Sequence, residues 1–478
     1  MAPGRRSVVR AGPLSDSNKP SAGDKLTQLN IAESFGEGRT LAIKGITEGE
    51  FRRVLTANFT PSATIKTPDR LFGRTKALRQ IERAMASQGR QVFIYGDRGV
   101  GKTSLAITAA IIANSGGHQP IYTVCSDTGS FSSVMKSVGD AVTSVEDRFE
   151  SGSTPLEISG SMFGMGGGLK PAQHGQAIIA PPQTLNDALD ILRYVLAKRS
   201  GRIIVVVDEM ERLQDQRERE KFAELIKNLP ELDDRIRFIF CGIANTVNEL
   251  IGSHPSAGRI LETIVLERLH HNYLWEIISR VASATKVTVE HDALVRISQI
   301  SDGFPHYVHL IGESMFWSLY DDPDYLSAVT AEHFKAGISG ALSRAEADLR
   351  LRYERATMKT KNKADYEEAL WALADRTSDK RQLSEVYESS YKRIMGTRRD
   401  RNILSKEKLN QRILSLRGES HGRIVVGYGS GWFGFRENIT RGYVRLRAEH
   451  EGVELGRDNA ITTLREQAVE EADQGYGH

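Results

Sequence analysis

Short apolar runs alternate with longer amphipathic stretches through the first half of the chain. Four of the apolar runs have the length of buried strands and predict β-strands at 91–95, 120–125, 202–207 and 237–241. Apolar residues recur at helical spacing elsewhere and predict helices at 102 to about 114, 184–199 and 216–228. Strands that alternate with helices of this length predict an α/β fold whose parallel sheet is covered on both faces.

The second half of the chain follows two other patterns. Helical periodicity alone continues from residue 272, and it predicts helices at about 272–286, 291–301, 305–321 and 330–356. A third pattern starts near residue 361 and predicts helices at 365–375, 382–395 and 405–417. A hairpin is expected next, with strands at 423–428 and about 442–447 joined by the glycine-rich run 429–434. Three helices followed by a β-hairpin predict a C-terminal winged helix.

These patterns predict several domains, since a chain of 478 residues is too long for one ordinary core. The expected segments are a mobile tail and lead-in at 1–67, an α/β core at 68–270, a helical lid at 271–358, a winged helix at 359–450 and a tail at 451–478. A stretch rich in Gly, Ser and Met predicts a flexible insertion at about 151–182.

The composition fits a globular protein of the cytoplasm. The chain is 40% hydrophobic and 26% charged, with a formal net charge of +3. It has no apolar run of about eighteen residues, so we expect no membrane-spanning helix. Two cysteines lie within apolar runs, which favours buried thiols in a reducing compartment over a disulfide.

A glycine-rich segment between the first predicted strand and its helix has the pattern G-x-x-x-x-G-K-[ST]. It comprises Gly96, Asp97, Arg98, Gly99, Val100, Gly101, Lys102 and Thr103, and Ser104 follows. Such a loop directs backbone N–H groups at phosphate oxygens, because glycine allows a tight turn and a close approach to the anion. We expect Lys102 to reach the β- and γ-phosphates of a nucleotide. A chance match is the alternative, and the strand-to-helix context argues against it.

A second motif follows an apolar strand. Ile203 to Val207 are all aliphatic, and Asp208 and Glu209 come next. Two carboxylates at the end of a buried strand are costly unless a cation or water uses them. Asp208 suits Mg²⁺, which would also take the Thr103 hydroxyl, and Glu209 suits the general base that activates water. The alternative is an exposed acidic turn before a capped helix.

With these motifs the chain resembles the AAA+ and STAND ATPases, and its predicted core at 68–270 has no guanine-reading N-K-x-D motif. Leu71-Phe72-Gly73-Arg74 resembles the adenine-side box of these families. The segment 238–246 resembles their sensor 1 strand, and the resemblance places Asn245 at the γ-phosphate or the attacking water. Asn245 could instead cap the following helix. The resemblance implies Mg²⁺-dependent ATP hydrolysis.

Two further residues are assigned through the same resemblance. Arg259 resembles the arginine that contacts the ATP of a neighbouring subunit, which implies a homo-oligomer; a surface arginine paired with an acid is the alternative. The segment 301–306 resembles the G-x-P version of sensor 2 found in STAND ATPases. It implies that Pro305 packs beside the adenine, with His306 as a weaker contact.

The C-terminal region is locally basic. Residues 376–447 contain 17 Lys and Arg against 7 Asp and Glu, an excess of ten positive charges. The recognition helix at 405–417 would carry Lys406, Lys408 and Arg412, and the hairpin would add Arg436, Arg441, Arg445 and Arg447. Cations interleaved with Trp432, Phe433 and Phe435 favour contact with DNA phosphates. Docking of a protein is the alternative.

Two functions therefore follow from the sequence. The first is an oligomeric ATPase that engages DNA through its winged helix, in replication, transposition or defence against mobile elements and phage; this layout also resembles the origin-recognition initiators. The second is a STAND-like signalling ATPase whose C-terminal module recruits a protein effector. The G-x-P segment favours the second and the basic module favours the first.

Overall fold

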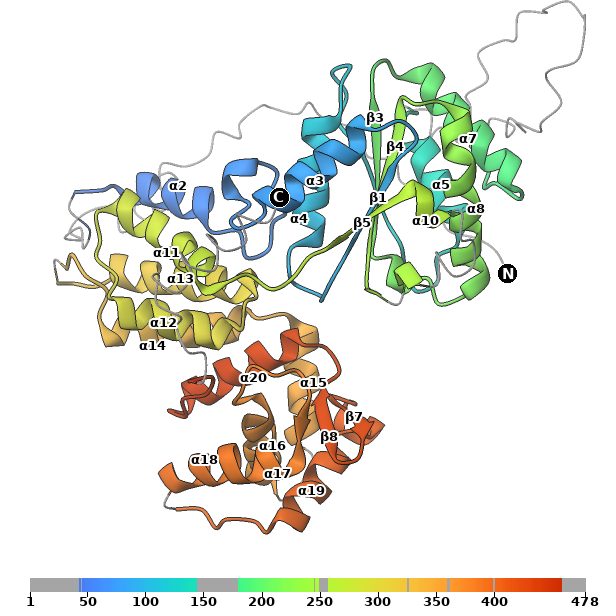
Figure 1. The fold of residues 1–478 in the computed structure, drawn as a ribbon. Helices are drawn as coiled ribbons and strands as arrows, with labels where there is room; N and C mark the ends of the chain where they lie inside the picture. The colour runs from blue at the N-terminus through green and yellow to red at the C-terminus, as the bar shows by residue number, and fades with distance from the viewer. Residues whose placement is uncertain are drawn as a thin grey trace, which may run out of the picture.

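The computed structural model describes residues 43, 45–143, 179–244, 246–248, 257–324, 326–358, 362–398 and 400–457. Within them, an α/β core, a helical region and a C-terminal module follow one another along the chain (Figure 1). No helix of the described residues is long and apolar enough to cross a bilayer.

The core is built on five parallel strands in the order β2-β3-β4-β1-β5. The strands are β1 (Gln91–Tyr95), β2 (Ile121–Val124), β3 (Ile203–Asp208), β4 (Ile236–Gly242) and β5 (Leu261–Val265). All residues of β3 and β4 are buried, as their nearly continuous apolar sequences require. The predicted α/β fold is confirmed, with β5 as a strand that the sequence pattern did not reveal.

Helices cover the two faces of the sheet and divide the core into two hydrophobic clusters. On one face lie α3 (Thr75–Ala86) and α4 (Lys102–Ala113). On the other lie α5 (Phe131–Asp140), α7 (Leu185–Lys198) and α8 (Gln216–Leu232). Successive side chains of a strand serve opposite faces, so Val206 packs toward α4 and Val207 packs toward α5, α7 and α8. The short elements of the core are η1 (Pro68–Arg70), η2 (Met210–Arg212) and α10 (Ala257–Ile260).

The helical region adds one helix from the N-terminal lead-in. Its members are α2 (Glu48–Asn58), α11 (His271–Thr285), α12 (His291–Ser301), α13 (Pro305–Tyr320) and α14 (Ala331–Arg344). Thr47 and Glu50 form a capping box that starts α2, and Phe51 stacks on Tyr320 with ring centroids 4.5 Å apart. The predicted helix at 330–356 is two helices, because the chain turns after Arg344 and α15 (Ala347–Thr357) packs on the C-terminal module.

The C-terminal module contains the expected helices and hairpin together with a third short strand. Its elements are α16 (Lys363–Ala374), β6 (Arg381–Gln382), α17 (Leu383–Glu385), η3 (Val386–Tyr391), α18 (Lys392–Thr397), α19 (Lys406–Ser415), η4 (Glu419–His421), β7 (Val425–Gly429), β8 (Trp432–Phe435) and α20 (Ile439–His450). The sheet is antiparallel in the order β6-β8-β7.

The prediction of a strand at about 442–447 is wrong. Gly429, Ser430 and Gly431 all have positive φ and turn the chain at once, so the partner strand is Trp432–Phe435. Residues 442–447 lie in α20, where Ile439, Tyr443 and Leu446 follow helical spacing and are buried. Arg441 and Arg445 are therefore not on a wing; both are buried, with side chains at most 2% exposed.

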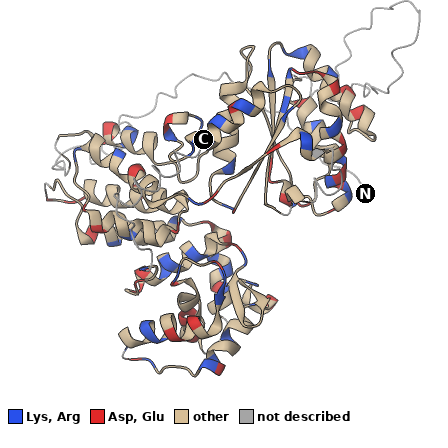
Figure 2. Cartoon of the chain, viewed as in Figure 1, with Lys and Arg blue, Asp and Glu red and all other residues tan. Residues whose placement is uncertain are grey.

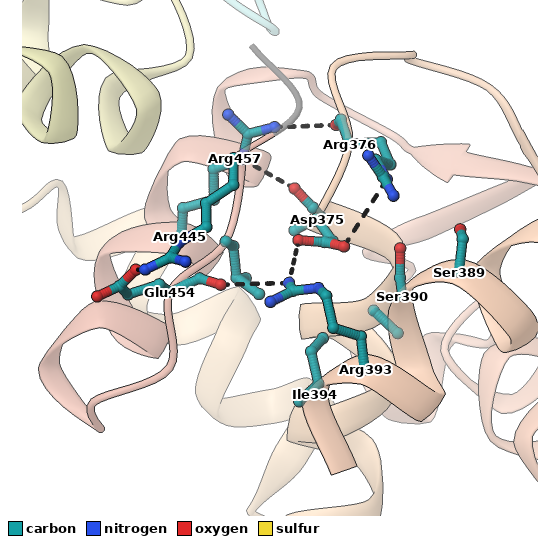
Figure 3. Close-up of polar contacts among 12 residues, drawn as sticks. Asp375, Arg376, Ser389, Ser390, Arg393, Ile394, Arg445, Glu454 and Arg457 are labelled. Carbon is teal, nitrogen blue, oxygen red and sulfur yellow. Dashed lines mark hydrogen bonds and ion pairs between the residues drawn. The ribbon is translucent and has the colours of Figure 1, made fainter. Parts of the chain in front are cut away.

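The helix α20 joins the C-terminal module to the helical region. Asp302, at the end of α12, accepts hydrogen bonds from Arg441 Nε at 2.6 Å and from Arg445 at 3.1 Å. Arg445 also donates to the backbone carbonyl of Arg376, a contact visible in Figure 3. In the same view Arg393 donates to Asp375 and to the carbonyl of Glu454, which holds the segment after α20 against the module.

Candidate functional site

The glycine-rich loop lies between β1 and the N-terminus of α4, as predicted. Gly96, Gly99 and Gly101 have φ of 158°, 83° and 96°, and the last two values are in the region that favours glycine. A Cβ on Gly99 would collide with Ile439 of α20, whereas one on Gly101 would meet no atom within 4 Å. The open side of the loop is therefore at Gly101, where α4 begins and its free N–H groups favour an anion.

Lys102 lies in the loop's own concavity. Its Nζ donates to the carbonyl oxygens of Gly96 at 3.0 Å and Asp97 at 2.9 Å, and the residue is 9% exposed. Backbone carbonyls are weak partners for an ammonium compared with the charged oxygens of a phosphate. A phosphate at Gly101 could take Lys102 from these carbonyls, so the arrangement fits a triphosphate.

Asp208 closes one side of the same concavity. Its Oδ2 accepts from the Thr103 hydroxyl at 2.6 Å and from the Tyr122 hydroxyl at 3.1 Å, and its Oδ1 accepts from the backbone N–H of Glu209 at 2.9 Å. Burial and the adjacent Asp208 raise the pKa of Tyr122, so its hydroxyl stays protonated and donates. The Tyr122 contact escaped the sequence analysis because it joins β2 to β3.

The donor set at Thr103 and Asp208 fits Mg²⁺. A hydroxyl and a carboxylate 2.6 Å apart are hard oxygen ligands, and Mg²⁺ usually adds phosphate and water oxygens to one or two carboxylates. No group of three or more His, Cys, Asp or Glu side chains forms a metal site within the described ranges. A cation at this position would therefore be completed by nucleotide and water.

Two glutamates follow Asp208 and differ in their surroundings. Glu209 has φ of 56°, and its carboxylate pairs with Arg212 at 3.0 Å, with both side chains more than two-fifths exposed. Glu211 lies in the turn η2, and burial raises its pKa. Its Oε2 is buried without a hydrogen-bond partner among the described residues. The pattern D-E-x-E carries this second acid, but the sequence analysis considered only the first.

These groups line a cavity of about 1070 Å³, large enough for a nucleotide. Most of the predicted site residues line it: Phe72, Arg74, Gly96, Asp97, Arg98, Gly99, Val100, Gly101, Lys102, Thr103, Ser104, Asp208, Glu209, Pro305 and His306. Gly73 does not line it, and a Cβ there would collide with Tyr273. Glu211 also lines the cavity.

Three segments form the end of the cavity where the nucleobase is expected. Phe72 lies beneath the Arg280 guanidinium, 4.9 Å from its ring centroid, and Pro305 and Ile277 line the same cavity. Arg74 is buried and donates to the carbonyls of Val100 and Glu267, so it braces the phosphate loop; burial lowers its pKa to about 10. The lead-in segment 60–65 supplies a wall that no motif indicated.

Two histidines of α13 face this lead-in segment. His306 Nδ1 lies 3.1 Å from the carbonyl of Pro61, while its Nε2 is buried and has no hydrogen-bond partner within the described part of the chain. Burial lowers the pKa of His306 and lowers that of His309 to about 3, so both rings are neutral at pH 7. A neutral ring with a free Nε2 in the cavity is suited to one hydrogen bond with a ligand.

The C-terminal module reaches the phosphate loop itself, a contact that sequence reasoning missed. Asn438, just before α20, donates to Asp97 Oδ2 at 3.0 Å, and Arg268 binds the same oxygen at 3.2 Å. Arg98 pairs with Glu437 at 3.3 Å and with Glu346 at 2.8 Å. Side chains distant in sequence thus hold Asp97 and Arg98, and only the tertiary fold brings them there.

Two predicted site residues remain besides Gly73 and those that line the cavity. Arg259 is exposed on α10, beside the edge strand β5, and does not line the cavity. Its assignment to a neighbouring subunit stays a prediction. Asn245 lies outside the described residues.

Basic and acidic residues both occur throughout the C-terminal module (Figure 2), and most of its described basic residues form ion pairs within the protein. Arg412 and Arg401 bind Asp365, and Arg401 also binds Glu368. Arg447 lies 3.9 Å from Glu451. In the described part of this region, the cations that lack a carboxylate partner within ion-pair distance are Lys380, Lys406, Lys408, Arg417 and Arg436.

Comparison with solved structures finds distant similarities that cover most of this chain. A Walker-type ATPase of Pyrococcus abyssi is 15% identical, with a TM-score of 0.46 over 80% of this chain and 99% of that one. Cdc6p of Pyrobaculum aerophilum is 15% identical, with a TM-score of 0.41 over 82% of this chain and 98% of that one. The ORC2 protein of Aeropyrum pernix is 13% identical, with a TM-score of 0.43 over 84% of this chain and 98% of that one.

Comparison with curated proteins gives no match. A protein-family model described as Novel STAND NTPase 1 matches residues 63–384. The match includes the phosphate loop, the acidic strand end and the helical region, and it extends into the C-terminal module. Because it spans more than half of the sequence, this chain belongs to the Novel STAND NTPase 1 family of P-loop NTPases.

Proposed function

We propose that this protein is a switch that binds and hydrolyses ATP with Mg²⁺, and that its C-terminal module responds to the nucleotide. One observation carries the proposal: Asp97 and Arg98 of the phosphate loop bind Asn438 and Glu437, which directly precede α20. A nucleotide that enters the loop must share it with these contacts. Its binding is therefore coupled to the position of the module.

The residues of the site have distinct roles in this proposal. Lys102 and the N–H groups at the start of α4 bind phosphate oxygens, and Thr103 and Asp208 hold the cation. Mg²⁺, when bound, neutralises charge that builds on the phosphate oxygens. Phe72 and Pro305 pack against the base, and His306 offers one hydrogen bond to it or to the ribose.

A homo-oligomer is proposed from Arg259. Its guanidinium is exposed at the edge of the core rather than in its own cavity, so it is free to reach the site of a neighbouring copy. A guanidinium supplied in this way stabilises charge that develops on a transferring phosphoryl group.

DNA is a second candidate partner. The observation that favours it is at the β7–β8 hairpin, here called the wing. Trp432 and Tyr428 are 41% and 47% exposed at the hairpin, and Lys380 lies 4.4 Å from the centroid of the Tyr428 ring. Arg436 and Arg417 are exposed on the same module. The cations of this tip could neutralise phosphates while its aromatic rings stack on bases, a combination that suits a nucleic acid.

The phosphate site predicts the effect of Lys102→Ala. This variant should lose ATP binding in calorimetry, because the loop no longer holds an ammonium for the β- and γ-phosphates. Lys227→Ala removes an exposed lysine from α8 and should bind like the wild type. Normal affinity in a folded Lys102→Ala protein would contradict the phosphate-site assignment.

The contacts of the module predict faster nucleotide exchange when they are removed. The double variant Glu437→Gln and Asn438→Ala should release a fluorescent ADP analogue about tenfold faster in stopped flow, a loss of about 1.4 kcal/mol of coupling. Glu419→Gln serves as the matched control, because it removes an exposed ion pair with Arg423 on the same module. Equal release rates in all three proteins would show that the module does not control the site.

The oligomer predicts complementation between two inactive proteins. Arg259→Ala subunits should bind ATP normally and lose hydrolysis, since the neighbouring γ-phosphate loses a charge worth roughly 10³-fold or more. Mixing them with Lys102→Ala subunits should restore part of the activity, because some interfaces then combine an intact lysine with an intact arginine. Failure to restore activity, with rates linear in protein concentration, would make Arg259 structural.

The wing predicts which residues DNA binding requires. Lys380→Ala combined with Trp432→Ala should weaken filter binding of duplex DNA about tenfold at low salt, with smaller differences at high salt. Lys227→Ala removes the same charge from the core and serves as the control. If the wild type binds no DNA, or if both variants bind alike, the wing is not a DNA surface.

A further inference from the structure

The turn after β3 separates the two glutamates that could activate water. Glu209 adopts a left-handed conformation with φ of 56°, which reverses the chain and leads directly into η2. Met210 is fully buried in the hydrophobic cluster beneath the sheet and anchors this turn. Glu209 and Glu211, on either side of Met210, are therefore held in fixed positions. Their carboxylates have different environments.

Glu209 is engaged on the solvent side. Its Oε2 lies 3.0 Å from Arg212 Nε, and the two side chains are 44% and 48% exposed. The carboxylate of Glu209 is therefore open to solvent and already has a guanidinium as its partner.

Glu211 differs from Glu209 in its partners. Both residues line the cavity with Lys102 and Asp208, but no ion pair of Glu211 occurs within the described residues. Its Oε2 is buried and has no hydrogen-bond partner there. A buried acceptor without a partner is costly to the fold, so a group that enters the cavity is the natural partner.

Asp208 cannot take that role, because its oxygens are already engaged. Thr103 and Tyr122 donate to Oδ2, and the N–H of Glu209 donates to Oδ1. Asp208 is thus placed to hold the cation with Thr103, and the buried carboxylate oxygen that lacks a partner among the described residues of the cavity is Oε2 of Glu211.

We propose that Glu211, rather than Glu209, is the catalytic carboxylate that binds and deprotonates the attacking water. The inference rests on the proposed ATP hydrolysis. The water oxygen forms a bond to the γ-phosphorus while the bond from that phosphorus to the β,γ-bridging oxygen breaks. The electron pair of the broken bond stays on ADP. The water proton passes to Glu211 and then to solvent, so the carboxylate is regenerated.

The test compares Glu211→Gln with Glu209→Gln in the full chain. Single-turnover cleavage of ATP should fall about 100-fold or more in Glu211→Gln and by much less in Glu209→Gln, because an amide accepts no proton from water. Calorimetry with Mg²⁺ and a non-hydrolysable ATP analogue should give affinities within about threefold of wild type for both variants. Glu224→Gln, an exposed acid on α8, is the control.

Each other outcome decides against the inference. Cleavage by Glu211→Gln within about threefold of wild type, or a larger loss in Glu209→Gln, would assign the proton to Glu209 instead. A loss of analogue affinity as large as the loss of cleavage would make Glu211 a binding or folding residue. Glu211→Asp keeps a carboxylate and should retain more cleavage than Glu211→Gln. A wild-type protein that binds but never cleaves ATP would overturn the proposed hydrolysis itself.

Discussion

The arrangement of the molecule depends on the ion pairs that the buried carboxylate of Asp302 forms. Asp302 is 6% exposed, and it ends α12 in a left-handed conformation with φ of 52°. It binds Arg441 and Arg445 of α20 and lies 3.5 Å from Arg268. Removing one partner of a buried ion pair typically costs roughly 3–5 kcal/mol, so these contacts fix the C-terminal module on the helical region.

Arg268 extends this interaction to the phosphate loop. It contacts Asp302 and Asp379 and also Asp97, whose carboxylate Asn438 binds as well. A triphosphate brings further negative charge to a loop whose polar residues already have partners. The proposed coupling of nucleotide and module would act through these shared residues, and a change in one affinity would then appear in the other. The packing of Ile439 against Gly99 adds a steric contact to this electrostatic one.

Local patterns predicted the parts of the site that depend on local geometry. The phosphate loop and Asp208 follow from a few adjacent residues, since glycine conformations and the end of an apolar strand determine them. The strand β8 was misplaced because residues 442–447 alternate in polarity while also fitting a helix. Arg441 and Arg445 looked solvent-exposed, and only the distant Asp302 explains their burial. Contacts between regions, such as Asn438 with Asp97, leave no local signal.

The C-terminal segment 376–447 is less basic in the folded protein than its sequence alone indicates. Its excess of ten positive charges was counted between residues 376 and 447, but many of the balancing carboxylates lie outside those limits. Asp302, Asp365, Glu368 and Asp375 all bind arginines of the segment. Much of the excess positive charge therefore depends on the limits chosen for the segment. In the folded protein, carboxylates from outside those limits balance it. What could attract a polyanion is the smaller set of exposed cations, some of them near the wing, and any DNA affinity must come from these.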